Sequence, residues 1–485
     1  MGRLVVVSNR VADPRKSASG GLAVAVGQAL DASGGLWLGW SGKVSDTGAG
    51  ADVAASGKLP PLPPLQMQRS GKVQLATFDL SPAQYEQFYL GYSNGVLWPV
   101  FHYRLDVADF DTDYFDAYRS VNALFAQQLM PLLQGDDEIW IHDYHLIPLA
   151  AQLRALGCKQ RIGFFLHIPL PPPPMLAAIP QHAWLMQSLF AYDVVGFQSQ
   201  ADVRHFGDYV VQELGAQAVP MPVNGAQQDA KEDAEKAAQR YTLEGCSVHV
   251  QAFPIGIDTQ EWARLAAGKD AREAYTTTCE QYARRRLLIG VDRLDYSKGI
   301  PQRIRAFRQL LMQFPENHES ATLIQIASPS RETVHAYTDI RVQLEGLCGA
   351  INGDFGTLDW IPVRYIHRTV ARKRLPGLCR AARVGLVTPL RDGMNLVAKE
   401  FIAAQDSADP GVLVLSRFAG AAEQLKQALL VNPYDIHGTA QAIQRALHMP
   451  LAERQERHQS LLRNIEQQDV HWWSSSFLKI LRSTA

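Results

Sequence analysis

Short apolar, β-branched runs alternate with stretches of helical periodicity along nearly the whole chain. This alternation is typical of β-α-β units, in which helices cover both faces of a parallel sheet. In the first half we predict strands at residues 4–7, 36–40, 74–78, 138–142, 163–168, 194–198 and 248–254. In the second half we predict them at residues 287–292, 322–327, 363–366, 384–388, 412–416 and 429–431. The expected fold class is therefore α/β.

The length of the chain, 485 residues, exceeds what one ordinary hydrophobic core holds, so we expect two domains. We place the first at residues 1–255 and the second at residues 256–460, with a joint and hinge at residues 254–258. Residues 461–485 continue a helical pattern that carries Trp472, Trp473 and Phe477, and we expect this helix to dock on the first domain. Residues 44–72 are predicted as a loop, and residues 217–244 as an exposed insertion or helix.

Composition narrows the possible partners and compartment. The chain has 47 Lys and Arg residues and 48 Asp and Glu residues. It therefore lacks the excess of basic residues that would indicate a nucleic-acid partner. The five cysteines form no C-x-x-C pair, which fits a reducing compartment rather than a disulfide framework. The sequence turns polar at Ser8 after four apolar residues, so we predict no signal peptide, and no apolar run reaches membrane-spanning length. We expect a cytoplasmic protein without a membrane partner.

The most informative motif follows the apolar run at residues 384–390, which contains the predicted strand 384–388. A tight polar loop, Arg391-Asp392-Gly393-Met394, leads to Asn395, which is a good N-cap for a helix that begins at Leu396. Free backbone N–H groups at a helix start, together with the helix dipole, make a site for phosphate or diphosphate. Glu400 follows one turn later, where a carboxylate could accept hydrogen bonds from a ribose. The motif outlines a nucleotide-sugar site.

Other polar segments follow predicted strands, where open parallel sheets bind their ligands. Arg293 and Lys298 share the loop after strand 287–292, and a guanidinium fork with a nearby ammonium suits a diphosphate. An isolated Arg-x-x-x-x-Lys is more often a solvated loop, and the helix start at Asn395 reverses those odds. The remaining segments are Ser8-Asn9-Arg10, Gly20-Gly21, His142-Asp143-Tyr144-His145, His167 and Ser330-Arg331.

Taken in order, these motifs resemble those of the α,α-trehalose-6-phosphate synthases, glycosyltransferase family 20. The resemblance runs from about Arg3 to the region of Trp472. The chain is similar to the bacterial form of the family, which has a single activity. It implies the GT-B architecture, two Rossmann-like, doubly wound parallel-sheet domains that face a deep interdomain cleft. It also implies transfer of glucose from UDP-glucose to glucose 6-phosphate, giving α,α-trehalose 6-phosphate and UDP, in trehalose biosynthesis and stress protection. Residues 1–255 would then be the acceptor side and residues 256–460 the donor side.

The resemblance also implies a role for each matching position. The catalytic residues would be Asp143, His167, Arg293, Lys298 and Asp392. Glucose 6-phosphate would be bound by Arg10, Tyr89, Trp98, Asp143 and Arg331. UDP-glucose would be bound by Gly20, Gly21, Arg293, Lys298, Val370 (through its backbone), Asp392, Gly393, Met394, Asn395, Leu396, Val397 and Glu400.

Neither a covalent nucleophile nor a metal site is expected. No side chain stands out as a nucleophile, unlike the paired carboxylates of retaining glycosidases. The resemblance instead implies front-face attack, in which the leaving diphosphate oxygen takes the proton of the acceptor. Asp111-Thr112-Asp113 looks like a D-x-D metal motif, but its place before a helical pattern favours helix capping. We predict no cofactor and no metal requirement.

Several alternatives stay open from the sequence alone. A related enzyme could use GDP- or ADP-glucose, or join a cyclitol through nitrogen. A silent sugar-phosphate sensor on the same fold is a second alternative. Asp143, Arg10 and Arg331 favour a sugar-phosphate acceptor and an active enzyme. The sequence leaves open the donor base, regulation, and whether the protein forms a dimer or tetramer.

Overall fold

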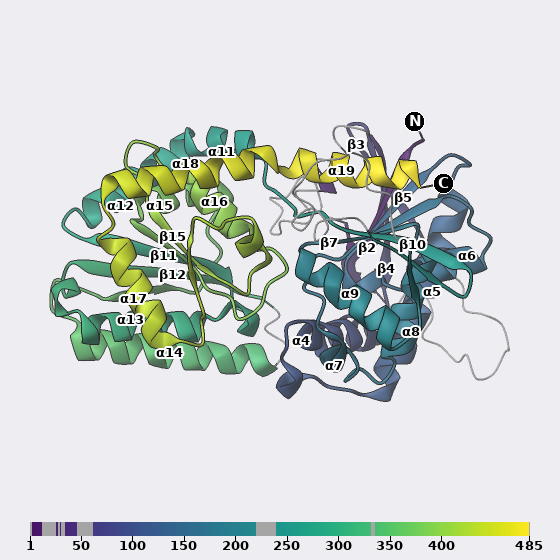
Figure 1. The fold of residues 1–485 in the computed structure, drawn as a ribbon, viewed down its shortest axis with the longest axis horizontal. Helices are drawn as coiled ribbons and strands as arrows, with labels where there is room; N and C mark the ends of the chain where they lie inside the picture. Colours follow the sequence, from purple (N-terminus) through teal and green to yellow (C-terminus); the bar gives the residue numbers. More distant parts are fainter. Residues whose placement is uncertain are drawn as a thin grey trace. The chain divides into compact units, whose positions relative to one another are not determined.

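The structure is a computed structural model that describes residues 2–11, 26–27, 30, 34–45, 62–219, 239–330 and 335–484. The chain divides into two compact units (Figure 1). One comprises Met1–Pro254 together with Trp473–Ala485, and the other comprises Ile255–Trp472. The chain therefore passes between the units twice, once after Pro254 and once after Trp472. Within the described part of the chain, no helix is long and apolar enough to cross a membrane.

The first unit is built on one mixed sheet with the strand order β3-β4-β2-β1-β5-β6-β7-β10-β9-β8. All neighbours from β4 to β10 pair in parallel, as the alternating pattern predicts. The strands are β1 (Leu4–Arg10), β2 (Gly35–Val44), β3 (Gln66–Ser70), β4 (Val73–Leu80), β5 (Glu138–His142), β6 (Arg161–Phe165), β7 (Val194–Phe197), β8 (Gln217–Val219), β9 (Gln239–Leu243) and β10 (Cys246–Ala252).

The two edges of this sheet correct the sequence prediction. Residues 44–72 were expected to be a loop, yet β3 lies there and pairs antiparallel with β4. Residues 217–244 were expected to be an insertion or helix, yet β8 and β9 extend the opposite edge in antiparallel pairing. Strands β3 and β8 form the sheet edges and are largely exposed, because an edge strand need not bury an apolar face, and in β9 only Tyr241 is buried. Hydrophobic alternation, the signal used for the central strands, is absent from them.

Helices of the first unit cover the sheet and carry part of the predicted site. A 13-residue π-helix, Tyr85–Leu97, contains Tyr89 and leads into α4 (Trp98–Phe101). Helix α5 runs over Thr112–Leu129, and the Asp111 carboxylate accepts a hydrogen bond from the Asp113 N–H at 2.9 Å. This bond confirms that the Asp111 motif is a helix cap. The other helices include α6 (Leu149–Ala155), α7 (Pro173–Leu176), α8 (His182–Gln187) and α9 (Gln200–Gln212).

The second unit is built on a fully parallel sheet with the order β13-β12-β11-β14-β15-β16. Every strand falls within two residues of its predicted bounds: β11 (Arg286–Arg293), β12 (Ala321–Ser328), β13 (Val363–Ile366), β14 (Val384–Val387), β15 (Val412–Ser416) and β16 (Leu429–Val431). In Figure 1, α13 (Ile300–Gln313), α14 (His335–Phe355) and α17 (Ile436–Leu447) lie on one side of the sheet. The other side carries α11 (Thr259–Ala266), α12 (Lys269–Gln281), α15 (Leu375–Ala381), α16 (Leu396–Ala404) and α18 (Leu451–Gln467).

The C-terminal helical pattern resolves into α18 and a second helix, α19 (Val470–Ser483). The later part of α19 belongs to the first unit. Its Phe477 ring is fully buried and stacks on Trp140, with ring centroids 4.7 Å apart. The Arg482 guanidinium forms a fork to the Glu138 carboxylate, with contacts of 2.8 to 3.0 Å. These contacts fix the end of the chain on the first sheet.

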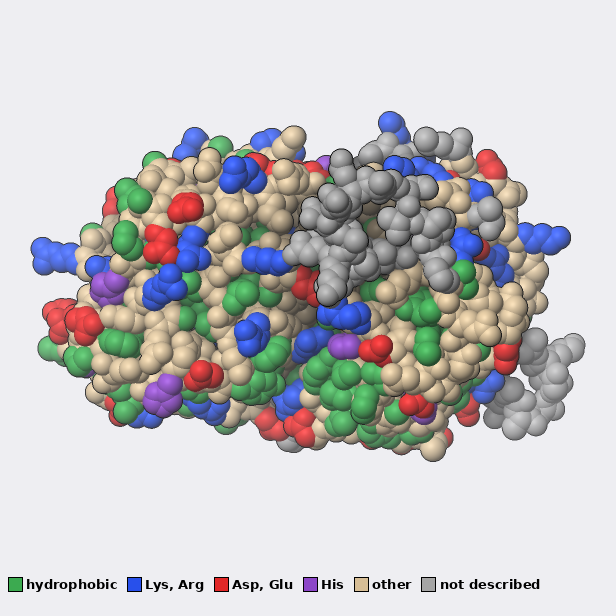
Figure 2. All heavy atoms as spheres, in the orientation of Figure 1, with side chains coloured by type: hydrophobic (Ala, Val, Ile, Leu, Met, Phe, Trp, Pro, Cys, Tyr) green, Lys and Arg blue, Asp and Glu red, His purple; other side chains and the backbone are tan. Residues whose placement is uncertain are grey.

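Lys and Arg side chains are interspersed with Asp and Glu side chains over the described residues on the visible face of both units (Figure 2). This mixture agrees with the formal net charge of −1.

Candidate active site

In the second unit, the loop after β11 is shaped by a buried carboxylate. The Asp295 side chain is fully buried and accepts hydrogen bonds from the Ser297 N–H at 2.9 Å and the Tyr337 hydroxyl at 3.0 Å. Gly299 then turns the chain into α13 with φ +62°, a conformation that favours glycine. A side chain there would also collide with the backbone, because an ideal Cβ would lie 2.3 Å from the Thr388 carbonyl oxygen. The loop therefore has one sterically defined path.

This loop meets the loop after β14 at an ion pair. The Lys298 ammonium donates to Asp392 at 2.6 Å, and their side chains are only 11% and 13% exposed. The Leu390 N–H bonds the Ser297 carbonyl at 2.8 Å, which joins the two loops through backbone as well. Two of the predicted catalytic residues are thus brought together, from positions 94 apart in the sequence. Arg293 ends β11 and is exposed, next to the same loop.

A fully buried arginine supports both loops and was missed by the sequence analysis. Arg303 of α13 contacts Asp292, Gln325 and Thr388, the last two at 2.9 and 3.0 Å. It also reaches the Lys298 carbonyl at 3.4 Å. A buried guanidinium needs such partners, since an unpaired charge in the interior is costly. The available signal was an arginine among the apolar residues that form the buried face of α13.

Asn395 caps α16 as predicted, and it also binds the acidic residue of the motif. Its side-chain oxygen accepts from the Ala398 N–H at 3.4 Å, and its amide donates to Asp392 at 3.1 Å. Its backbone has φ +79°, which Asn tolerates better than most residues. The amides of Leu396 and Val397 lie in the first helical turn, where no intrahelical acceptor is available. They are suited to receive phosphate oxygens.

The short loop that contains Gly393 and Met394 is fixed by backbone hydrogen bonds from the segment at Gly420. The Gly420 N–H bonds the Asp392 carbonyl at 3.1 Å, and the Ala421 N–H bonds the Met394 carbonyl at 3.0 Å. Gly420 has no room for a side chain, because an ideal Cβ would lie 1.8 Å from the Gly393 carbonyl oxygen. This predicted donor loop, residues 391–394, is therefore a rigid part of the second unit.

Glu400 lies one turn into α16 and is half-buried. Burial raises its pKa to about 7, against a smaller lowering by Arg372. Arg372 is itself paired with Glu261 at 2.6 Å and lies over the Trp262 ring. Val370 precedes this cluster in the chain and is half-buried. The carboxyl of Glu400 can therefore change its charge near neutral pH.

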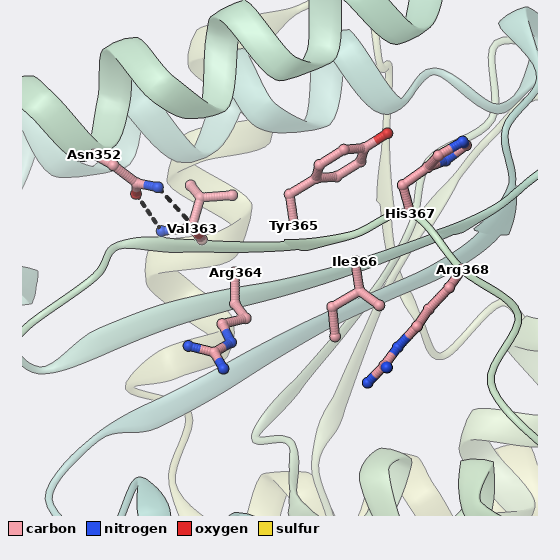
Figure 3. A pocket seen from close by; sticks show the side chains of 7 residues that line it. All are labelled: Asn352, Val363, Arg364, Tyr365, Ile366, His367 and Arg368. Atoms are coloured by element: carbon pink, nitrogen blue, oxygen red, sulfur yellow. Dashed lines mark hydrogen bonds between the residues drawn. The ribbon is translucent and has the colours of Figure 1, made fainter.

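A groove of about 540 Å³ lies along the edge strand β13, away from the Lys298–Asp392 pair in the chain. In Figure 3 the side chains of Tyr365 and His367 point to one side of the strand, and those of Arg364 and Arg368 to the other. The Asn352 amide bonds both the N–H and the carbonyl of Val363, at 2.9 and 3.0 Å. None of the predicted donor residues that the structure describes lines this groove. The predicted donor site lies instead at the Lys298–Asp392 ion pair and the start of α16.

Among the predicted acceptor residues, Arg10 ends β1, Tyr89 lies in the π-helix and Trp98 begins α4. Arg10 is exposed, with its guanidinium carbon 5.9 Å from the Trp40 ring centroid. The Tyr89 ring stacks on His145 at 5.9 Å with an interplanar angle of 10°. Trp98 is 4% exposed and packs on His102 with centroids 4.1 Å apart. Trp98 therefore offers little free ring surface.

Asp143 and His167 are brought together by neighbouring strands β5 and β6. Asp143 has φ 76° and ψ 166°, a region that is essentially restricted to glycine, and such strain clusters at functional sites. Its carboxylate accepts from the His167 N–H at 3.3 Å, while its own N–H bonds the Phe165 carbonyl at 2.8 Å. Because the surrounding backbone holds this conformation, the carboxylate has a fixed direction.

His167 is paired with a second histidine that the sequence analysis did not single out for a role. The two rings meet through His142 Nδ1 and His167 Nε2 at 3.1 Å, and Gln198 lies 3.5 Å from His167 Nδ1. Burial lowers the pKa of His167 to about 3, and burial with the neighbouring ring lowers that of His142 well below its usual value. Both rings are therefore neutral at working pH. His167 is suited to hydrogen bonding rather than to carrying a positive charge.

Three predicted residues, Gly20, Gly21 and Arg331, lie outside the described residues. Among the residues that the structure describes, no group of three or more His, Cys, Asp and Glu side chains could hold a metal ion.

Comparison with known proteins decides the family. The family described as Glycosyltransferase family 20 matches residues 6–483. The chain belongs to glycosyltransferase family 20. A family member from Enterobacter sp. (strain 638), named trehalose-6-phosphate synthase, is 45% identical over 486 residues, covering 100% of this chain and 96% of the relative. The trehalose-6-phosphate synthase of Sinorhizobium fredii is also 45% identical, covering 100% and 99%.

Solved structures of family 20 enzymes agree over the same length. An α,α-trehalose-phosphate synthase (UDP-forming) from Burkholderia xenovorans, in complex with glucose 6-phosphate, has a TM-score of 0.91 at 46% identity. This match covers 99% of the present chain and 100% of the Burkholderia xenovorans chain. The Escherichia coli protein bound with UDP-2-fluoro glucose has a TM-score of 0.89 at 44% identity, and both chains are fully covered. The GT-B class predicted from the sequence is confirmed.

Proposed function

We propose that this family 20 member is a UDP-forming α,α-trehalose-6-phosphate synthase, which transfers glucose from UDP-glucose to glucose 6-phosphate. One observation carries the proposal. The Asp392 carboxylate accepts hydrogen bonds from both Lys298 and Asn395 at the start of α16. A cation, a carboxylate and the first amides of α16 therefore lie together, an arrangement that supports binding of a nucleoside diphosphate sugar. Full-length relatives with this named activity support the same conclusion.

The donor diphosphate would be neutralised by Lys298, Arg293 and the first amides of α16. These groups act on the charge that develops as the glycosidic bond to UDP breaks, and preorganised charges act most strongly there. Lys298 already points at Asp392 in the free protein, so donor binding would share its ammonium between carboxylate and phosphate. Asp392 and the neighbouring loop amides would hold the glucose hydroxyls. The α configuration would be retained by front-face attack, without a covalent intermediate.

The acceptor would be held by the first unit, with Arg331 from the second. Arg10 and Arg331 would bind its phosphate, Tyr89 and Trp98 would contact the same sugar phosphate, and Asp143 would accept from its hydroxyls. The neutral His167 would hydrogen-bond near the transferred glucose. Positioning of the two substrates would then supply much of the rate enhancement.

Chelation tests the predicted independence from metal and cofactors. Lys298, Arg293 and the helix amides supply the positive charge that a divalent ion supplies in other transferases. Turnover should therefore be unchanged after dialysis against EDTA. Loss of turnover that added Mg²⁺ or Mn²⁺ restores would contradict this part of the proposal. A homo-oligomer and a cytoplasmic location remain predictions.

Product identification tests the activity directly. Purified protein is incubated with UDP-, GDP- or ADP-glucose and glucose 6-phosphate, and the disaccharide phosphate is identified by mass and NMR. We expect α,α-trehalose 6-phosphate, with UDP-glucose the best donor. Preference for another base would support a related transferase, and binding of both substrates without product would support a silent sensor.

A further inference from the structure

A fully buried lysine in α16 has no part in the contacts proposed above. The Lys399 ammonium is 0% exposed and donates to the Ile255 carbonyl and to the Gln424 side-chain oxygen, both at 2.7 Å. Neither acceptor is a carboxylate. Burying an ammonium without a counter-ion is costly, and here burial lowers its pKa to about 7. An apolar side chain would fill the space without that cost, so the hydrogen bonds themselves need an explanation.

The first partner, Ile255, begins the second unit where the chain leaves the first. The segment in which the chain returns to the first unit, residues 468–472, packs against the residues that follow Ile255. An ideal Cβ on Gly256 would lie 2.3 Å from the Gln468 carbonyl oxygen and 2.4 Å from the Asp469 carbonyl carbon. The Val470 N–H bonds the Ile257 carbonyl at 3.3 Å. The two crossing segments, residues 255–258 and 468–472, are therefore in direct backbone contact.

The second partner, Gln424, links these crossing segments to the donor loop. Its side-chain amide donates to the Gln468 side chain. It directly follows the 3-10 helix Gly420–Glu423, whose first amide bonds the Asp392 carbonyl at 3.1 Å. A continuous network thus joins the motif that would bind the donor to both places where the chain passes between the units.

We propose that Lys399 is a positioning residue that ties both crossing segments to the helix whose N-terminus receives the donor diphosphate. The inference rests on the proposed function. Lys399 touches no substrate, but it makes the donor site and the crossing segments one rigid body. In the proposed function the first unit would supply most of the acceptor contacts, so the placement of acceptor against donor would depend on this body. Loss of the tie should disturb that placement while leaving donor contacts intact.

Three variants separate this role from a general effect on folding. Lys399→Met removes the tie, and Gln468→Met cuts the link to the second crossing segment while Lys399 stays in place. Lys426→Met is the matched control, because Lys426 is an exposed lysine near Gln424. For each variant we measure the Kd of UDP by calorimetry, and the kcat and KM for glucose 6-phosphate at saturating UDP-glucose. Amide hydrogen exchange is followed in residues 255–258 and 468–472.

For Lys399→Met and Gln468→Met we expect a Kd of UDP close to that of the unmodified protein. We expect kcat/KM for glucose 6-phosphate to fall by about 10–100-fold, because small misplacements of reacting groups have effects of this size. Amide exchange should rise in the two crossing segments and stay unchanged in β12. Lys426→Met should match the unmodified protein in every measurement.

The proposal is overturned if either folded variant keeps normal kcat/KM, or if UDP affinity falls together with kcat/KM. It is equally overturned if exchange in the crossing segments does not change in Lys399→Met. Failure of the proposed function shows separately, as absence of trehalose 6-phosphate with the unmodified protein. The exchange measurement then still decides whether Lys399 ties the crossing segments to α16.

Discussion

The Lys298 ammonium lies 2.6 Å from the Asp392 carboxylate, and the two side chains join the loops that follow β11 and β14. These strands are neighbours in the second sheet, so their carboxyl ends open at the same edge. The same carboxylate binds the Asn395 amide at the start of α16. The residues of the proposed donor site thus lie together because β11 and β14 are neighbours in the sheet.

Removal of the Lys298 ammonium should affect turnover more than folding. We expect Lys298→Ala to lower kcat by roughly 10²–10³, the effect of losing one preorganised charge-stabilising group. Arg293→Ala should fall in the same range. Lys426→Ala, an exposed lysine change in the same unit, should leave kcat unaltered. Steady-state kinetics with UDP-glucose and glucose 6-phosphate check this, and an unchanged kcat in Lys298→Ala refutes the assigned role.

Asp143 should show a conflict between stability and activity. Its φ of 76° suits glycine and strains any other residue. Asp143→Gly and Asp143→Ala both remove the carboxylate, so both should lose most turnover. The Gly variant should be more stable than the Ala variant by about 1–3 kcal/mol, the cost of holding a non-glycine residue in this backbone region. Urea unfolding compares the two. Equal stability would show that the backbone relaxes at this position.

Donor binding should depend on pH through Glu400. Its pKa in the free protein is about 7, and ribose hydroxyls would favour the ionised carboxylate, so donor binding should release a proton. The KM for UDP-glucose should therefore rise as the pH falls from about 8 to about 6. In Glu400→Gln, whose side chain does not ionise, this part of the profile should be flat. A KM that falls on acidification would contradict the role.

The histidine pair should make the protein sensitive to acid. The folded-state pKa of His167 is about 3, against 6.5 for an ordinary histidine, and that of His142 is also lowered. Between these values the unfolded chain binds more protons, so the free energy of unfolding should fall as the pH drops below about 6.5. Each histidine contributes up to about 1.4 kcal/mol per pH unit in that window.

The variant His142→Gln/His167→Gln tests this assignment. Its free energy of unfolding should decline less steeply between about pH 6 and pH 4 than that of the unmodified protein. Urea titrations at several pH values give both slopes. Identical slopes would mean that other groups carry the acid sensitivity.

The sequence predicted buried strands accurately and missed polar, exposed ones. Strands β5, β13, β15 and β16 have their predicted bounds, because short apolar runs between turn residues mark buried strands. The edge strands β3 and β8, and β9 beside β8, carry no such pattern and were missed. Arg303 and His142 were missed for a different reason. Their roles depend on partners that no local pattern identifies.

The sequence by itself determined the alternation of strands and helices, the N-cap at Asn395 and the polar residues that end each strand, since all of these depend on local order along the chain. Only the tertiary structure decided that Lys298 meets Asp392, that His142 meets His167, and that Lys399 binds Ile255. Side-chain periodicity shows which face of an element is buried, but not which element covers it. Which element covers a given face depends on the strand order and on the paths of the crossover connections. Both are determined by packing across the whole domain.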